Sequence, residues 1–183
     1  EKILNIPILN QIEDSPAEGY CGESSIQMIL AYYGLDKSQT EINKAGKPEH
    51  PDLYFNELIP AIENITNNQF MGHMMVFNDI NYRDFIKYQI DTHIPVLCGF
   101  KLNPSNSPEW GADHVSVING YDDNGLYILT TWDNNPRIYR TWEQLELTKL
   151  YTNEHDLGYS FQNLDNQSAT VFTILISKNK SVK

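Results

Sequence analysis

Cysteine and basic residues are scarce in this chain of 183 residues. It has only two cysteines, Cys21 and Cys98, which excludes a framework of several disulfides and a cysteine-rich metal site. Lys and Arg number 13 against 24 Asp and Glu, so the formal net charge is −11. No basic cluster precedes the short tail at 178–183. The composition therefore argues against a nucleic acid or an anionic membrane surface as the partner.

Long hydrophobic runs and internal repeats are also missing. No stretch reaches the roughly 18 apolar residues that span a bilayer, and no signal peptide is visible, so membrane insertion is not expected. The hydrophobic content of 40% is ordinary for a packed globule, and the length indicates a single domain over residues 1–183. The chain begins at Glu1 without Met, which leaves room for a removed leader and leaves the compartment open, export included.

The first half of the chain is patterned for helices. After an extended apolar segment at 1–12, apolar residues at helical spacing predict a helix from Cys21, which Gly34 ends. Residues 37–42 resemble a short capped helix that ends near Gly46. Further helices are predicted over 53–65, which Pro60 breaks or restarts, and over 81–92.

The second half of the chain is patterned for strands. Strands are predicted over 95–100, 114–121, 126–132, 137–140 and 170–176, with a shorter one at 74–77 and a short helix from Trp142. Asn124 and Gly125 stand between two apolar runs, which is a strong hairpin signal. Helices first and an antiparallel sheet second make the predicted fold class α+β.

Cys21 stands at the predicted start of the first helix, between Gly19 and Gly22. Unpaired backbone N–H groups and the positive end of the helix dipole lower the pKa of a thiol at such a position. The placement predicts an activated nucleophile, and the alternative is a buried structural cysteine that begins a helix. Cys98, in an apolar strand, is expected to be a small core residue.

A cysteine nucleophile needs a base, and the base needs a third group that orients its imidazole. His114 opens the first hairpin strand and Asp133 ends the second, so an antiparallel turn would bring both to one end of the sheet. The alternative is a structural histidine at a strand end. The other histidines, His50, His73, His93 and His155, have no comparable hairpin partner.

These residues together resemble a known family. The order is Gln11, then Gly-Tyr-Cys-Gly at the start of a helix ending Tyr-Tyr-Gly, then His-Val-Ser-Val-Ile-Asn-Gly-Tyr-Asp from His114, then Asp133. This order is similar to that of the papain-like cysteine peptidases, above all the bacterial branch related to the double-glycine leader peptidases that process bacteriocins. The likeness covers residues 7 to 147 and implies a papain-like fold with a cleft between the helical half and the sheet.

The resemblance also implies roles for four residues. Cys21 would be the nucleophile, His114 the general base and Asp133 the orienting carboxylate. Gln11 would donate a hydrogen bond in the oxyanion hole, with the Cys21 backbone N–H as the second donor.

The sequence departs from the family pattern at three places. Gln11 precedes Cys21 by more residues than is usual, so the extra residues would have to bulge out. Glu23 follows Cys-Gly where the family commonly has a small residue or Pro. The usual Asp-Pro is replaced by Trp132-Asp133-Asn134, so Asn134 is an alternative to Asp133 as the residue that orients His114. Only one of the two can face His114, because successive side chains of a strand point to opposite faces.

Three classes of function remain open, because an acyl-thioester can serve different acceptors. Transfer to water makes a cysteine peptidase or amidase, which is the favoured class, with a protein or peptide as substrate. Transfer of the acyl group to an amine makes an acyltransferase or transglutaminase, and a deamidase uses the same triad. If the site is catalytically inert, the chain is a binding module with a papain-like fold. No cofactor or metal is implied, because the thiol chemistry is self-contained, and the substrate and oligomeric state stay open.

Overall fold

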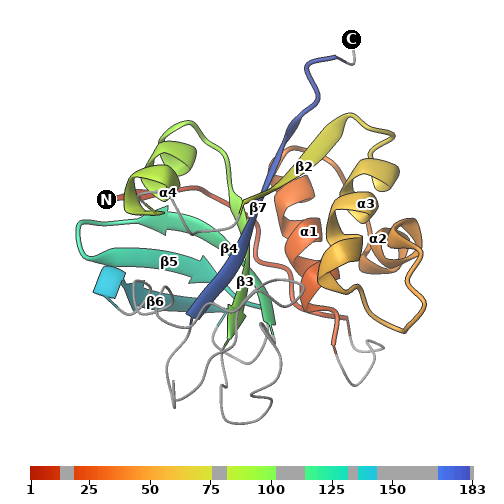
Figure 1. The fold of residues 1–183 in the computed structure, drawn as a ribbon, viewed down its shortest axis with the longest axis horizontal. Coiled ribbons are helices and arrows are strands. Elements are labelled where there is room, and N and C mark those ends of the chain that lie inside the picture. The colour runs from red at the N-terminus through yellow and green to blue at the C-terminus, as the bar shows by residue number, and fades with distance from the viewer. Residues whose placement is uncertain (13–18, 76–81, 102–113, 132–135, 144–168, 182–183) are drawn as a thin grey trace.

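The computed structural model describes residues 1–12, 19–75, 82–101, 114–131, 136–143 and 169–181. Within them the helices are α1 (Cys21–Tyr32), α2 (Gln39–Gly46), α3 (Phe55–Ile65) and α4 (Tyr82–Asp91). The strands are β1 (Lys2–Ile3), β2 (Phe70–Met75), β3 (Val96–Lys101), β4 (His114–Tyr121), β5 (Gly125–Leu129), β6 (Arg137–Thr141) and β7 (Ala169–Lys178). In Figure 1, α1, α2 and α3 gather to the right of the central strands and α4 lies to the left. The predicted α+β class is confirmed.

The helix α1 forms where the apolar spacing predicts it. Ile26, Ile29 and Leu30 are fully buried on one face, and α1 packs against β4. The helix ends at Tyr32, and Gly34 follows in the left-handed conformation with φ +82, which glycine adopts without a steric penalty.

The next two helices show one correct and one wrong prediction. The Ser38 hydroxyl accepts from the Glu41 N–H, and the Glu41 carboxylate accepts from the Ser38 N–H, so the predicted cap of α2 is present. In contrast, α3 runs without interruption through Pro60. Its inner face, Leu58, Ala61 and Ile62, is fully buried, and this packing outweighs the hydrogen bond that proline cannot donate.

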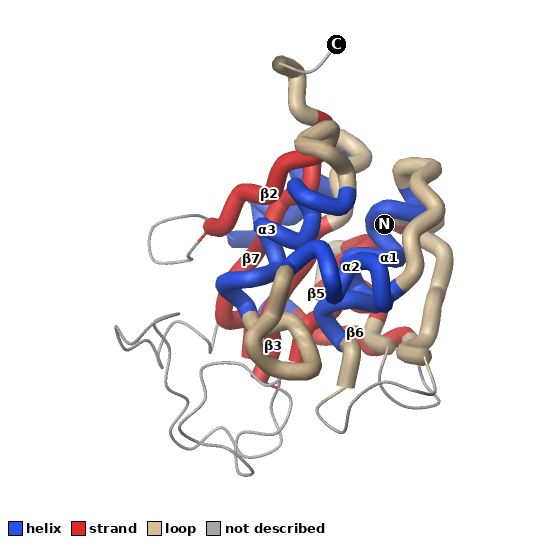
Figure 2. The backbone as a smooth tube through the Cα atoms, turned by 90° about the vertical axis from the view of Figure 1, so that its right-hand side faces the viewer, coloured by secondary structure: helices blue, strands red, loops and turns tan. Residues whose placement is uncertain are grey.

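The strands form an antiparallel sheet in the order β2-β7-β3-β4-β5-β6, with β1 added to β4. The predicted hairpin of β4 and β5 is confirmed, with Val117 opposite Leu129 and a turn that Asp122 and Gly125 close. Figure 2 shows β2 and β7 side by side. Their register pairs Phe70 with Lys178.

Several predicted boundaries differ from the observed ones. The strand predicted at 74–77 begins earlier, as β2 from Phe70, and residues 76–77 lie outside the described part. The strand predicted to reach residue 132 ends at Leu129, and residue 132 lies outside the described part. Most of the short helix predicted from Trp142 lies outside the described residues, and the single-domain organisation of 1–183 stays a prediction.

A tight approach of β1 holds the N-terminal segment on β4. A Cβ added to Gly120 would lie 2.7 Å from the Lys2 carbonyl oxygen, so only glycine allows this pairing. The Leu4 N–H donates to the Asn119 carbonyl, and the Asn119 side chain donates back to the Leu4 carbonyl. Leu4 and Ile6 thereby enter the hydrophobic core.

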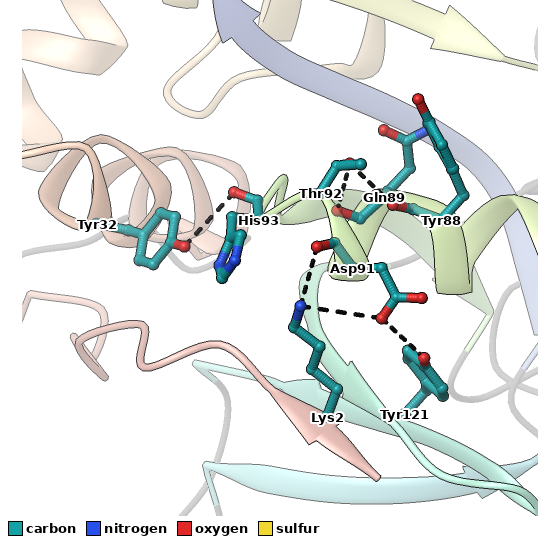
Figure 3. Close-up of polar contacts among 8 residues, drawn as sticks. All are labelled: Lys2, Tyr32, Tyr88, Gln89, Asp91, Thr92, His93 and Tyr121. Carbon is teal, nitrogen blue, oxygen red and sulfur yellow. Dashed lines mark hydrogen bonds and ion pairs between the residues drawn. The ribbon is translucent and has the colours of Figure 1, made fainter.

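The end of α4 ties three other elements together, as Figure 3 shows. The Lys2 ammonium donates to the Asp91 carbonyl oxygen at 2.9 Å, and the Tyr121 hydroxyl donates to the Asp91 carboxylate at 2.8 Å. The Tyr32 hydroxyl of α1 lies 3.5 Å from the His93 carbonyl oxygen. These contacts hold β1, β4 and α1 against the end of α4.

The core lies between the helices and the sheet. Cys98 is fully buried in it beside Val96 and Leu97, so its predicted structural placement is confirmed. Among the described helices, none is both long and apolar enough to cross a membrane.

Candidate active site

Cys21 is the first residue of α1 and is partly buried. The backbone before it turns at Gly19, whose φ of +85 favours glycine. The residue after it is held close to α3, because a Cβ added to Gly22 would lie 2.8 Å from a methyl carbon of Leu58. The two glycines around Cys21 are therefore needed to place the helix end.

Gln11 reaches the same helix end despite its long spacing from Cys21. Its side-chain Oε1 accepts from the Tyr20 N–H at 2.5 Å, and its Nε2 donates to the Thr131 hydroxyl at 3.4 Å. A Cβ on Gly19 would come within 2.7 Å of this Oε1. The structure thus brings the amide of Gln11 beside the residue that precedes Cys21. Residues 13–18 lie outside the described part, so the expected bulge stays a prediction.

His114 opens β4 and is 5% exposed. The thiol of Cys21 has a hydrogen bond with the backbone of Val115, the next residue along β4. The Ser25 hydroxyl, one turn into α1, donates to the Val115 carbonyl at 3.2 Å. The first turn of α1 therefore packs on the start of β4, at the residue that follows His114.

The two candidates for the third position, Asp133 and Asn134, lie outside the described residues. Asp133 as the orienting carboxylate therefore stays a prediction.

The pKa of the Cys21 thiol differs from the sequence-based prediction. This pKa is raised to about 11: burial is the largest cause, the carboxylates of Glu23 and Asp52 add to the rise, and hydrogen bonds with the Val115 and Gly22 backbone act against it. The expectation of a lowered pKa is wrong, because the cost of placing a charge in a buried site exceeds the stabilisation from the helix end.

Glu23 is the buried acidic residue closest to Cys21 along the chain. Its Oε1 accepts from the Leu53 N–H and from the Asn43 side chain, each at 2.8 Å. The residue is fully buried, and burial raises the pKa of its carboxyl group. Glu23 thus connects α1 to α2 and to the segment before α3, and it places an ionisable group two residues from the thiol.

Three hydroxyl side chains complete the site, and sequence reasoning missed them. The Thr131 hydroxyl accepts from Ser24 at 2.8 Å as well as from Gln11, and Ser24 also lies 3.3 Å from the Cys21 carbonyl oxygen. The Thr130 hydroxyl lies 2.7 Å from His114 Nε2. Two successive threonines at the end of an otherwise apolar strand were the only sequence signal for these contacts.

No group of three or more His, Cys, Asp or Glu side chains is arranged to hold a metal ion within the part of the chain that the structure describes. The Asp122 carboxylate in the hairpin turn accepts from the Asn124 and Gly125 N–H groups and from the Tyr127 and Tyr139 hydroxyls. These donors explain Asp122 as a structural residue of the turn.

A cysteine at the start of a buried helix, beside a strand that opens with histidine, on an α+β scaffold, defines the class of papain-like cysteine peptidases. The sequence matches the Peptidase_C39 like family over residues 3–168. The chain therefore belongs to this family, which confirms the resemblance and the expected enzyme class.

Solved structures agree on the fold. The peptidase domain of Streptococcus ComA, a bifunctional ABC transporter involved in quorum sensing, superposes with a TM-score of 0.59 at 13% identity, over 96% of this chain and 100% of that domain. A C39-like peptidase from Bacillus anthracis gives 0.59 at 13% identity, over 98% of each chain. A double-glycine motif protease from an AMS/PCAT transporter, solved with its leader peptide, gives 0.57 at 12% identity, over 98% of this chain and 96% of that one. No curated protein matches the sequence.

Proposed function

We propose that the chain hydrolyses peptide or isopeptide bonds through a thioester on Cys21, with His114 as the general base and Gln11 as an oxyanion donor. The observation that carries this proposal is the packing of the first turn of α1 on the start of β4, which puts the thiol against the Val115 backbone. The predicted role of Asp133 as orienting carboxylate belongs to the same proposal.

The reaction follows from these groups. His114 takes the proton from the Cys21 thiol as the sulfur attacks the acyl carbon, so a C–S bond forms and the carbonyl oxygen gains negative charge. The C–N bond then breaks, and the leaving amine takes the proton from His114. Water, deprotonated by His114, then attacks the thioester carbon. The C–S bond breaks, the acid is released, and the sulfur takes the proton back from His114.

The raised pKa of Cys21 decides when the proton moves. With a pKa of about 11, the thiol is protonated at neutral pH in the free protein. Proton transfer to His114 therefore accompanies the attack, instead of preceding it as in a stable thiolate–imidazolium pair.

Gln11 is built to support the developing oxyanion. Its Oε1 is occupied by the Tyr20 N–H, which fixes the orientation of the amide group. The contact of Nε2 with Thr131 is long, at 3.4 Å, so this N–H donor is only weakly held in the free protein. The donor next to the nucleophile is then available to a substrate oxyanion.

The substrate class that fits is an extended peptide or an unstructured protein segment. The support is the family membership and the leader peptide bound to the similar transporter protease. The proposed substrate of this chain is a peptide, and the proposal does not include a preference for a double-glycine sequence.

The test is cleavage of a mixed pool of unstructured peptides, followed by mass spectrometry, with and without a large excess of a primary amine. Products that each gain one water, from the protein but not from Cys21→Ala, support hydrolysis. The variant Cys98→Ala is the matched control and should cleave normally, because Cys98 is buried in the core. Products that carry the added amine instead assign a transferase, and side-chain carboxylates formed from amides without cleavage assign a deamidase. Binding of peptides that is unchanged in Cys21→Ala and yields no product would make the chain a binding module.

A further inference from the structure

The end of β5 places a hydroxyl group on the imidazole of His114. Thr130 follows the last residue of β5 and is 5% exposed, as is His114. The distance from Thr130 Oγ1 to His114 Nε2 is 2.7 Å, which is the length of a good hydrogen bond. The Thr130 N–H donates to the Pro136 carbonyl at 2.9 Å, so the backbone that carries this hydroxyl is itself held.

We infer that Thr130 is a positioning residue of His114, holding the imidazole at Nε2 through its hydroxyl. The inference rests on the proposed function of His114 as the general base. It does not give Thr130 any contact with substrate.

The chemistry of the pair follows from the two ring nitrogens. A neutral imidazole carries one N–H, and the other nitrogen holds the lone pair that can accept a proton. When Thr130 accepts the Nε2 hydrogen, Nδ1 holds the lone pair and is the nitrogen that takes the Cys21 proton. When Thr130 donates to Nε2 instead, Nδ1 carries the hydrogen and cannot act as a base. Since a hydroxyl allows both states, Thr130 fixes the ring plane firmly but the tautomer weakly.

The hydroxyl of Thr130 differs from a carboxylate in its charge. A carboxylate on Nε2 stabilises the imidazolium that forms during catalysis, whereas a hydroxyl is neutral. The carboxylates of Glu23 on α1 and of Asp52 before α3 act against ionisation of the Cys21 thiol. Each of these features disfavours a resting thiolate–imidazolium pair, which agrees with the protonated thiol described above.

Thr130 and Asp133 would compete for a hydrogen bond with the same atom, His114 Nε2. Nε2 carries at most one hydrogen, and Thr130 already lies within hydrogen-bond distance of it. A carboxylate acting on the same nitrogen would have to share that hydrogen with Thr130. The two residues can therefore be separated by substitution.

The experiment compares Thr130→Val, Thr130→Ser, Thr130→Asp and Asp133→Asn with the unchanged protein. Thr92→Val is the matched control, because the Thr92 hydroxyl is exposed and donates only to carbonyls at the end of α4. The first readout is the rate of Cys21 alkylation by iodoacetamide against pH, measured by intact mass, with His114→Ala defining the histidine-dependent part. The second is kcat and KM on a cleaved peptide, and circular dichroism confirms that each variant is folded.

Thr130→Val should lower the histidine-dependent alkylation at pH 7 and lower kcat while KM stays within about twofold, and Thr130→Ser should restore both. Thr130→Asp replaces the neutral hydroxyl with a carboxylate and should raise alkylation at pH 7 about tenfold, which corresponds to one pKa unit. If Thr130→Val keeps the pH profile of the unchanged protein while Asp133→Asn alters it, Asp133 positions His114 and the inference is overturned. Alkylation that depends on Thr130 in a protein that cleaves no peptide would uphold the positioning role and reject only the peptidase.

Discussion

Titration of the Cys21 thiol is the most direct test of the site as described. The perturbation is a rise of pH from 7.5 to 9.5 in the Cys98→Ala background, so that only Cys21 can react. A thiol with the ordinary pKa of about 8.5 goes from roughly 9% to roughly 91% thiolate over this range, a tenfold change. With a pKa of about 11, the thiolate fraction rises about a hundredfold over the same range.

The assay is the initial rate of iodoacetamide addition, followed by intact mass. The ratio of rates at the two pH values is informative because the nucleophilicity of one thiolate cancels in it. At pH 7.5 the absolute rate should be about 300-fold below that of a free thiol, from the two thiolate fractions. A rate that levels off before pH 9 would refute the reasoning, and a rate that stays constant down to about pH 5 would show a preformed thiolate–imidazolium pair.

Other predictions follow from single contacts. Glu23→Gln should lower the pKa of Cys21 and speed its alkylation at pH 7.5 several-fold, because it removes a charge that raises this pKa and keeps an oxygen acceptor. An unchanged rate would show that the charge of Glu23 does not affect the pKa of the thiol. Gln11→Ala should lower kcat about 100-fold by removing an oxyanion donor, and it should leave the rate of Cys21 alkylation unchanged. If kcat and the alkylation rate fell by the same factor, the variant would instead have damaged the helix end. Gly22→Ala should destabilise the fold by about 1–3 kcal/mol in urea denaturation, because its Cβ would overlap Leu58; a smaller effect would mean that α3 can move away. The free energy of unfolding should also fall as pH rises from about 8.5 to about 11, because the Cys21 thiol ionises in this range in the unfolded protein and stays protonated in the folded protein. Over this pH range the melting temperature of the protein should drop more than that of Cys21→Ala.

Local signals predicted much of the fold. The Ser38 cap, the apolar face of α1 and the Asn124-Gly125 hairpin each depend on a few neighbouring residues, and such features can be read from sequence. Pro60 was misjudged because its cost is offset by the packing of α3, which no local pattern reports.

The candidate site was predictable only in its topology. The hairpin pattern predicted only that His114 and Asp133 lie at one end of the sheet, and the family resemblance was needed to expect Cys21 beside His114. The pKa of the thiol was not predictable, because it depends on how closely α1, β4 and the segment around Asp52 enclose the sulfur. The contact of Thr130 with His114 was missed because it requires knowing where β5 ends.

The pairing of β1 with the far end of β4 has a practical consequence for labelling. Lys2 lies opposite Tyr121, and the seven residue steps from there to His114 span about 23 Å at the usual rise of a strand. A fluorophore or affinity handle attached at the first residue would stand away from the thiol along the whole strand. It could report on peptide capture by energy transfer over a useful distance without obstructing the chemistry.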